Sequence, residues 1–71
     1  MLTGKRFQMR TETLALAEIG GKREAITIPA GAVIKVVSGP RQNDQLMDVL
    51  WAGRIVKVFA VDVDARGREI S

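Results

Sequence analysis

Five cationic side chains near the start of the chain have the type and spacing that could bind a ligand most directly. They are Lys5, Arg6, Arg10, Lys22 and Arg23. Residues 1–23 also contain Glu12 and Glu18 and so carry a net charge of +3 (five minus two), whereas 24–71 hold six basic and six acidic groups. If the segment around Lys5 lies near Arg23, these cations would form one patch for the phosphates of a nucleic acid. The alternative is a solvated basic edge that discourages pairing between sheets.

The chain lacks the side chains that usually carry out acid–base and nucleophilic catalysis or bind metal ions. The 71 residues include no histidine and no cysteine, which removes Ser–His–Asp and Cys–His arrangements and the common ligands of zinc. Asp62 and Asp64 offer two carboxylates, but calcium requires six or more oxygen ligands, and capping of a helical turn explains Asp62. We therefore expect a non-enzymatic protein without catalytic residues, cofactor or metal. An oligomeric enzyme whose site forms only at a symmetry axis is an alternative.

A hairpin over 45–61 is the clearest element that could position a binding surface. Two apolar runs flank Ala52-Gly53, which suits a two-residue loop because glycine accepts a positive φ. This register sets Asp48 opposite Lys57, so that the only two charges inside the runs form a favourable cross-strand pair. A three-residue loop would separate these charges.

The two faces of this hairpin differ in composition. One face carries residues that we expect in the core, namely Met47, Val49, Val56, Val58 and Ala60. The other face surrounds the Asp48–Lys57 pair with Leu46, Leu50, Ile55 and Phe59. This second face is too apolar for free exposure and too charged for an interior, so either the chain's own N-terminal strand or a partner covers it. We predict that it is a protein interface between copies of the chain.

A second hairpin is expected over 13–28, around the turn Gly20-Gly21. A two-residue loop there pairs Glu18 with Arg23, again with opposite charges. The competing interpretation is a short helix over 11–19, which its Leu, Ala and Glu residues favour. The strand is preferred because a β-rich remainder needs pairing partners.

Shorter elements complete the chain. We expect strands at 5–10, 32–37 and 68–70 and a polar loop at 41–44. Residues 62–67 are typical of one 3₁₀ or helical turn, with Asp62 as N-cap and Gly67 as a left-handed stop.

Phe7, Trp51 and Phe59 are the aromatic residues of the chain. Exposed aromatics between basic residues stack nucleic-acid bases, and Phe7 does lie between Arg6 and Arg10. The alternative is that Phe7 packs in the core and Trp51 lies over its end. The aromatic cluster of peptide-binding SH3 domains is missing, since the chain has no tyrosine.

The succession of elements resembles an SH3-like barrel, and in detail it is similar to short uncharacterised bacterial proteins. Three stretches carry this resemblance: 28–31 (Ile-Pro-Ala-Gly), 34–40 (Ile-Lys-Val-Val-Ser-Gly-Pro) and 49–54 (Val-Leu-Trp-Ala-Gly-Arg) running on to 59–62 and Arg66-Gly67. The resemblance implies a single all-β domain over 1–71, a small SH3-like barrel of five to six short antiparallel strands. It implies no activity, because this fold serves peptide binders, nucleic-acid binders and oligomeric scaffolds alike.

The expected function is therefore that of a binding or assembly module that associates with itself, as a homodimer or a higher oligomer. The alternative is weak, sequence-nonspecific binding of nucleic acid through the basic N-terminal residues. The longest apolar run, 58–61, is far too short to span a membrane, and no apolar stretch follows the first basic residues. We accordingly expect a cytoplasmic protein with no membrane partner.

Overall fold

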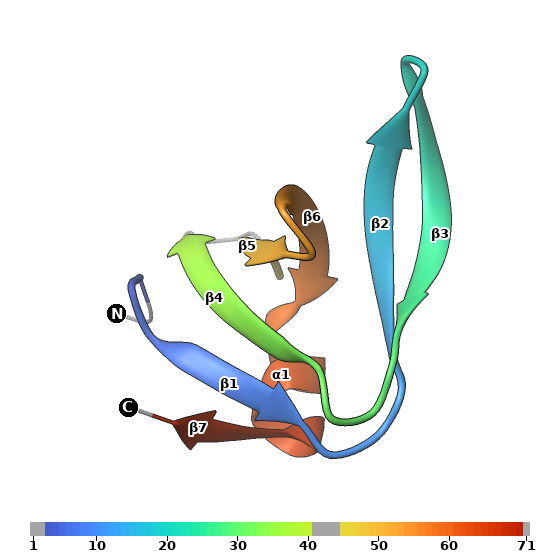
Figure 1. Ribbon diagram of the computed structural model, residues 1–71. Coiled ribbons are helices and arrows are strands. Elements are labelled where there is room, and N and C mark those ends of the chain that lie inside the picture. Colours follow the sequence, from blue (N-terminus) through green and yellow to red (C-terminus); the bar gives the residue numbers. More distant parts are fainter. Residues whose placement is uncertain (1–2, 41–44, 71) are drawn as a thin grey trace.

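A single antiparallel sheet with one short helix forms the structure. The computed structural model describes residues 3–40 and 45–70, so the predicted polar loop at 41–44 lies outside the described residues. The strands and the helix are β1 (Arg6–Met9), β2 (Thr13–Ile19), β3 (Lys22–Ile28), β4 (Val33–Ser38), β5 (Leu46–Trp51), β6 (Arg54–Phe59), α1 (Ala60–Arg66) and β7 (Gly67–Ile70). Their order in the sheet is β3-β2-β6-β5-β4-β1-β7 (Figure 1).

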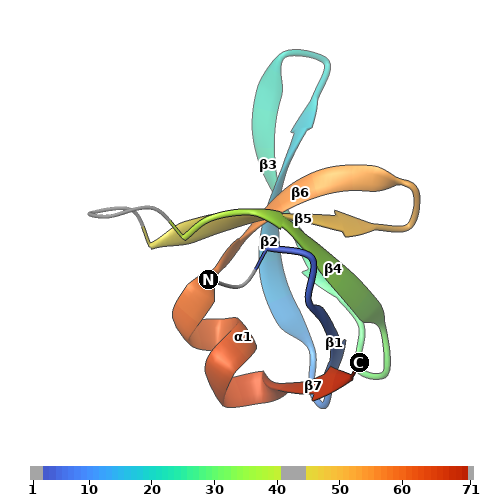
Figure 2. The same cartoon turned by 90° about the vertical axis from the view of Figure 1, so that its left-hand side faces the viewer.

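Seven strands are present in the described part of the chain, one or two more than the five to six of the predicted barrel. All the individually predicted strands are found, including those expected at 5–10 and 68–70, which form the two shortest strands, β1 and β7, and bond to each other at one edge of the sheet. The opposite edge is β3, and the two edges do not pair with each other among the described residues. The sheet curves around one core without closing (Figure 2).

Period-two alternation builds the core on the inner side of the sheet. Side chains of a strand point alternately to its two faces, and alternate residues of β5 and β6 are buried accordingly. The buried apolar residues are Phe7, Met9, Ala15, Ala17, Ile28, Ile34, Val36, Met47, Val49, Val56, Val58 and Val63. The predicted core residues of the 45–61 hairpin are confirmed, with Ala60 only partly buried and packed against the cluster.

Both hairpins have the predicted register. Asp48 pairs with Lys57 across β5 and β6, and Glu18 pairs with Arg23 across β2 and β3. In the loop between β5 and β6, Ala52 and Gly53 have φ values of 54° and 79°, as a two-residue turn between twisted strands requires. Residues 13–19 form a strand, so the competing helix is wrong.

The two predicted ends of the helical turn were wrong. The helix begins at Ala60 with Phe59 as its N-cap, and no side chain caps it; Asp62 lies in its first turn instead. Gly67 has an extended backbone, with φ −106° and ψ 157°, and opens β7. The physical reason is that β6 runs directly into α1, which places Val63 in the core. The N-cap therefore lies at Phe59, three residues before the predicted Asp62.

Candidate interaction surface

The outer face of the β5–β6 hairpin contains the four apolar residues predicted as an interface. We use "outer face" for the side of the sheet away from the core, and "central face" for its part formed by Leu46, Asp48, Leu50, Ile55, Lys57 and Phe59. The central face forms three cross-strand rows, with Leu50 opposite Ile55, Asp48 opposite Lys57 and Leu46 opposite Phe59. Leu50 is 40% exposed and Ile55 is 52% exposed. Leu46 and Phe59 are half-buried.

The N-terminal strand does not cover the central face. Strand β1 pairs with β4 and β7 at the far side of the sheet. Its apolar residues Phe7 and Met9 are buried in the core on the inner side. The interpretation in which the chain's own N-terminus covers this face is therefore wrong for the described residues.

The polar middle row is held in a defined geometry. The Lys57 Nζ donates to Asp48 Oδ1 at 2.9 Å, and the Ser38 hydroxyl donates to Asp48 Oδ2 at 2.9 Å. The Lys57 side chain remains 42% exposed and that of Asp48 30% exposed. Because an ammonium group has three donors, Lys57 retains capacity to bind a further acceptor.

Exposed aliphatic residues continue this surface onto the neighbouring strands. Leu14 on β2, and Val33 and Val37 on β4, are each more than two-fifths exposed and alternate with buried neighbours. They therefore point to the same outer side of the sheet as Leu50 and Ile55. The prediction omitted these three residues, although period-two alternation in their strands was a usable signal. The other large exposed aliphatic residues in the described part of the chain lie elsewhere, namely Ile19 at a hairpin tip and Val61 on α1.

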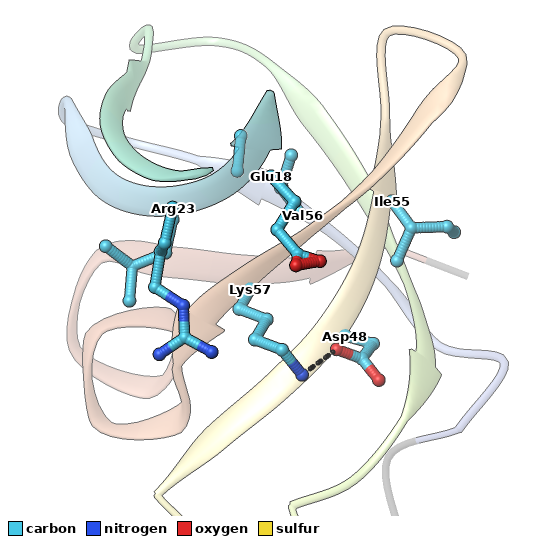
Figure 3. Close-up of a pocket in the computed structure, with 8 residues that line it drawn as sticks. Glu18, Arg23, Asp48, Ile55, Val56 and Lys57 are labelled. Carbon is cyan, nitrogen blue, oxygen red and sulfur yellow. Dashed lines mark hydrogen bonds and ion pairs between the residues drawn. The ribbon is translucent and has the colours of Figure 1, made fainter. Parts of the chain in front are cut away.

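A shallow pocket opens where β2 and β6 diverge. The two strands are paired only at Ala15–Val58 and Leu16–Lys57, and beyond these pairs the hairpins project apart (Figure 2). The resulting pocket has a volume of about 240 Å³ and brings Glu18 and Arg23 to the same opening as Lys57 and Asp48 (Figure 3). It is smaller than the roughly 300–1,000 Å³ of typical small-molecule sites. We therefore regard it as a hollow within a larger surface.

The five N-terminal cations do not form one patch. Lys22 and Arg23 lie at the tip of the β2–β3 hairpin, which projects away from β1 (Figure 1). Lys5 forms an ion pair with Glu69 at 3.6 Å. Arg10 donates from Nη2 to the carbonyl oxygen of Ala65 at 2.8 Å and so supports the end of α1. The condition for the phosphate patch, proximity of these two regions, is therefore not met.

The aromatic residues are largely used for packing. Phe7 is buried, and Trp51 is half-buried and packs against the core at the end of β5. Trp51 is also opposite Arg54 in the hairpin register. Phe7 is therefore not accessible for stacking on a base.

Within residues 3–40 and 45–70, no three acidic, histidine or cysteine side chains come together in a way that could hold a metal ion. The single described helix, α1, has seven residues, and no described helix is long and apolar enough to cross a membrane. Comparison with known proteins finds no matching family model, no matching curated protein and no matching solved structure.

Proposed function

We propose that this chain is a non-enzymatic assembly module, a small SH3-like β domain that associates with a second copy of itself through its outer face. The strand order supports the SH3-like classification, with a curved antiparallel sheet and a short helix just before the last strand. The open edge between β3 and β7 is where it departs from a closed barrel.

The observation that carries the proposal is the placement of the exposed aliphatic side chains. Among residues 3–40 and 45–70, five of the seven large hydrophobic residues that are clearly exposed lie on the outer face, namely Leu14, Val33, Val37, Leu50 and Ile55. Exposed apolar residues on adjacent strands of one sheet face indicate an interaction site, whereas single scattered residues do not. The Asp48–Lys57 pair supplies the polar group that gives such a surface specificity.

Self-association also meets a need of a domain this small. A chain of 71 residues buries a limited fraction of its surface when it folds alone. Burial of an aliphatic side chain contributes about 1.5–3 kcal/mol when it is complete, so partial coverage of several such residues by a second copy adds usefully to stability.

Sedimentation velocity over a wide range of protein concentration tests the proposal. We expect the wild-type chain to show a concentration-dependent shift from monomer to dimer, and Ile55→Glu to remain monomeric because it places a charge in an apolar row of the interface. Val61→Glu is the matched control, since Val61 is 64% exposed but lies on α1, away from the outer face. A wild type that stays monomeric at every concentration, or an equal effect of both variants, would overturn the proposal.

A further inference from the structure

We infer that the self-association of this chain is two-fold symmetric, with the symmetry axis parallel to the strands and running between β5 and β6 over the central face. This inference rests on the proposed function and specifies the geometry of the same surface. It follows from the positions of charged and apolar side chains in the hairpin register.

This rotation places each of the three rows of the central face over the same row of the second copy, and the facing side chains are complementary. A two-fold axis along the strands exchanges the β5 and β6 positions of each row, so that Asp48 faces Lys57 of the second copy and Lys57 faces its Asp48. The apolar rows match in the same way, with Leu50 over Ile55 and Leu46 over Phe59. A surface patch that contacts its own copy in this manner is an isologous interface.

The charges distinguish this axis from the one perpendicular to it. A two-fold axis across the strands would keep each residue of the middle row on its own side of the hairpin. Asp48 would then face Asp48 of the second copy, and Lys57 would face Lys57. Because like charges brought together in an interface are strongly unfavourable, the charge pattern selects the axis along the strands.

Two charged residues outside the central face fit the same axis. Lys35 on β4 lies beside Leu50, and Glu18 on β2 lies two residues beyond Leu16, which pairs with Lys57. The rotation carries Lys35 to the side of the second copy's hairpin on which Glu18 lies, at the pocket where β2 turns away from β6. Neither residue belongs to an ion pair among the described residues, whose pairs are Lys5–Glu69, Lys57–Asp48 and Arg66–Asp62. The dimer brings Lys35 an oppositely charged neighbour and adds a second cation near Glu18, which already lies opposite Arg23 in its own hairpin.

The size of the central face implies a reversible dimer. Its six side chains, with a few neighbours, are far fewer than the roughly 20–30 residues that each partner contributes to a standard stable interface. We therefore expect rapid exchange between monomer and dimer, and the experiments must detect a weak equilibrium.

Charge reversal tests the complementarity. Lys57→Asp makes the middle row wholly acidic and Asp48→Lys makes it wholly basic, so each variant alone should dimerise at least roughly tenfold more weakly than wild type. Mixed in equal amounts, the two variants should associate with each other about as strongly as wild type does with itself. The double variant, Asp48→Lys with Lys57→Asp, retains both kinds of pair and should behave like wild type. Thermal unfolding of each variant shows whether it is folded.

Cross-linking tests the direction of the axis. The chain has no cysteine, so Ile55→Cys introduces a unique thiol. Packed sheets lie about 10 Å apart, too far for a direct disulfide but within reach of a short bismaleimide such as bismaleimidoethane. The axis along the strands places the two thiols in the same row, and we expect efficient cross-linking. The perpendicular axis would separate them by a further four residues, about 13 Å along the strands. Val61→Cys on α1 is the control.

The outcomes separate this inference from the proposed function. A wild type that is monomeric contradicts both. Two results would retain the proposed assembly module but overturn the inferred symmetry axis. In the first, Ile55→Glu disrupts the dimer but Ile55→Cys does not cross-link. In the second, the two charge-reversed variants associate no better when mixed than either does alone. Cross-linking of Ile55→Cys together with recovery of association in the mixture supports the axis as inferred.

Discussion

Gly67 lies so close to the carbonyl group of Val63 that there is no room for a side chain at position 67. The backbone N–H of Gly67 donates to the carbonyl oxygen of Val63 at the end of α1. A Cβ added to Gly67 would be only 2.7 Å from that oxygen and 3.3 Å from the sulfur of Met9. The glycine is therefore required by space where the helix meets β7, and its extended φ of −106° places no special demand on it.

We expect Gly67→Ala to destabilise the fold by about 1–3 kcal/mol, as overpacking of a close contact does. For a domain of this size, each 1 kcal/mol lowers the melting temperature by roughly 4–8 °C. The measurement is thermal unfolding followed by circular dichroism. Gly31→Ala is the control, because nothing lies within 4 Å of its added Cβ and only its φ of +88° is strained. A smaller loss for Gly67→Ala than for Gly31→Ala would contradict this account.

Ala52→Asn should stabilise the β5–β6 hairpin. Ala52 has a φ of 54°, in the left-handed region that alanine adopts at a cost and that asparagine tolerates better. We expect a gain of about 0.5–1 kcal/mol in the free energy of unfolding, measured by urea denaturation. Gly53→Ala at the next position, with a φ of 79°, should change stability in the opposite direction. The explanation fails if both substitutions shift stability the same way.

The Asp48–Lys57 pair should contribute measurably but modestly to the stability of the monomer. A double-mutant cycle with Asp48→Ala and Lys57→Ala isolates their coupling energy, which we expect at about 0.2–1 kcal/mol because both side chains remain partly exposed. Measurements are made at concentrations where the chain is monomeric. The longer Lys5–Glu69 pair, at 3.6 Å and with both side chains about half exposed, provides a comparison with a smaller expected coupling. Equal couplings would argue against a special role of the central row.

Thr13→Val should lower stability by about 1 kcal/mol. Thr13 is only 2% exposed, and its hydroxyl donates to the carbonyl oxygen of Thr11 at 3.2 Å. Valine has the same shape but cannot donate, so the contact at the start of β2 is lost. Thr27→Val on β3 is the matched control because Thr27 is an exposed strand residue, and we expect a change near zero there. Urea denaturation of both variants provides the comparison.

The separated cations predict a low salt dependence of any nucleic-acid binding. Each phosphate contact contributes about 0.9 to the slope of log K against log salt for duplex DNA. Two of the five cations lie at the β2–β3 tip and three around β1, so one region contains at most three of the five, which corresponds to a slope of about 2.7. Fluorescence anisotropy of a labelled oligonucleotide, titrated at several salt concentrations, measures this slope. A slope of about 4.5 would match five contacts made together and would revive the nucleic-acid alternative.

Local pattern in the sequence determined both hairpins. Alternation of apolar and polar residues has a period of two, and Ala52-Gly53 and Gly20-Gly21 mark two-residue turns, so the pairing of Asp48 with Lys57 and of Glu18 with Arg23 followed from short-range information. The division of the β5–β6 hairpin into a core face and an outer face was settled by the same periodicity.

Tertiary structure decided the features that depend on contacts between distant segments. The start of α1 at Ala60 and the need for glycine at position 67 arise from packing around Val63, which no local signal in 60–67 reveals. The divergence of β2 from β6 and the separation of Lys5 from Arg23 depend on the direction in which each hairpin leaves the sheet. Local propensities specify which residues extend and turn, whereas the relative direction of two hairpins is set by the twist of the whole sheet and by burial of one shared core.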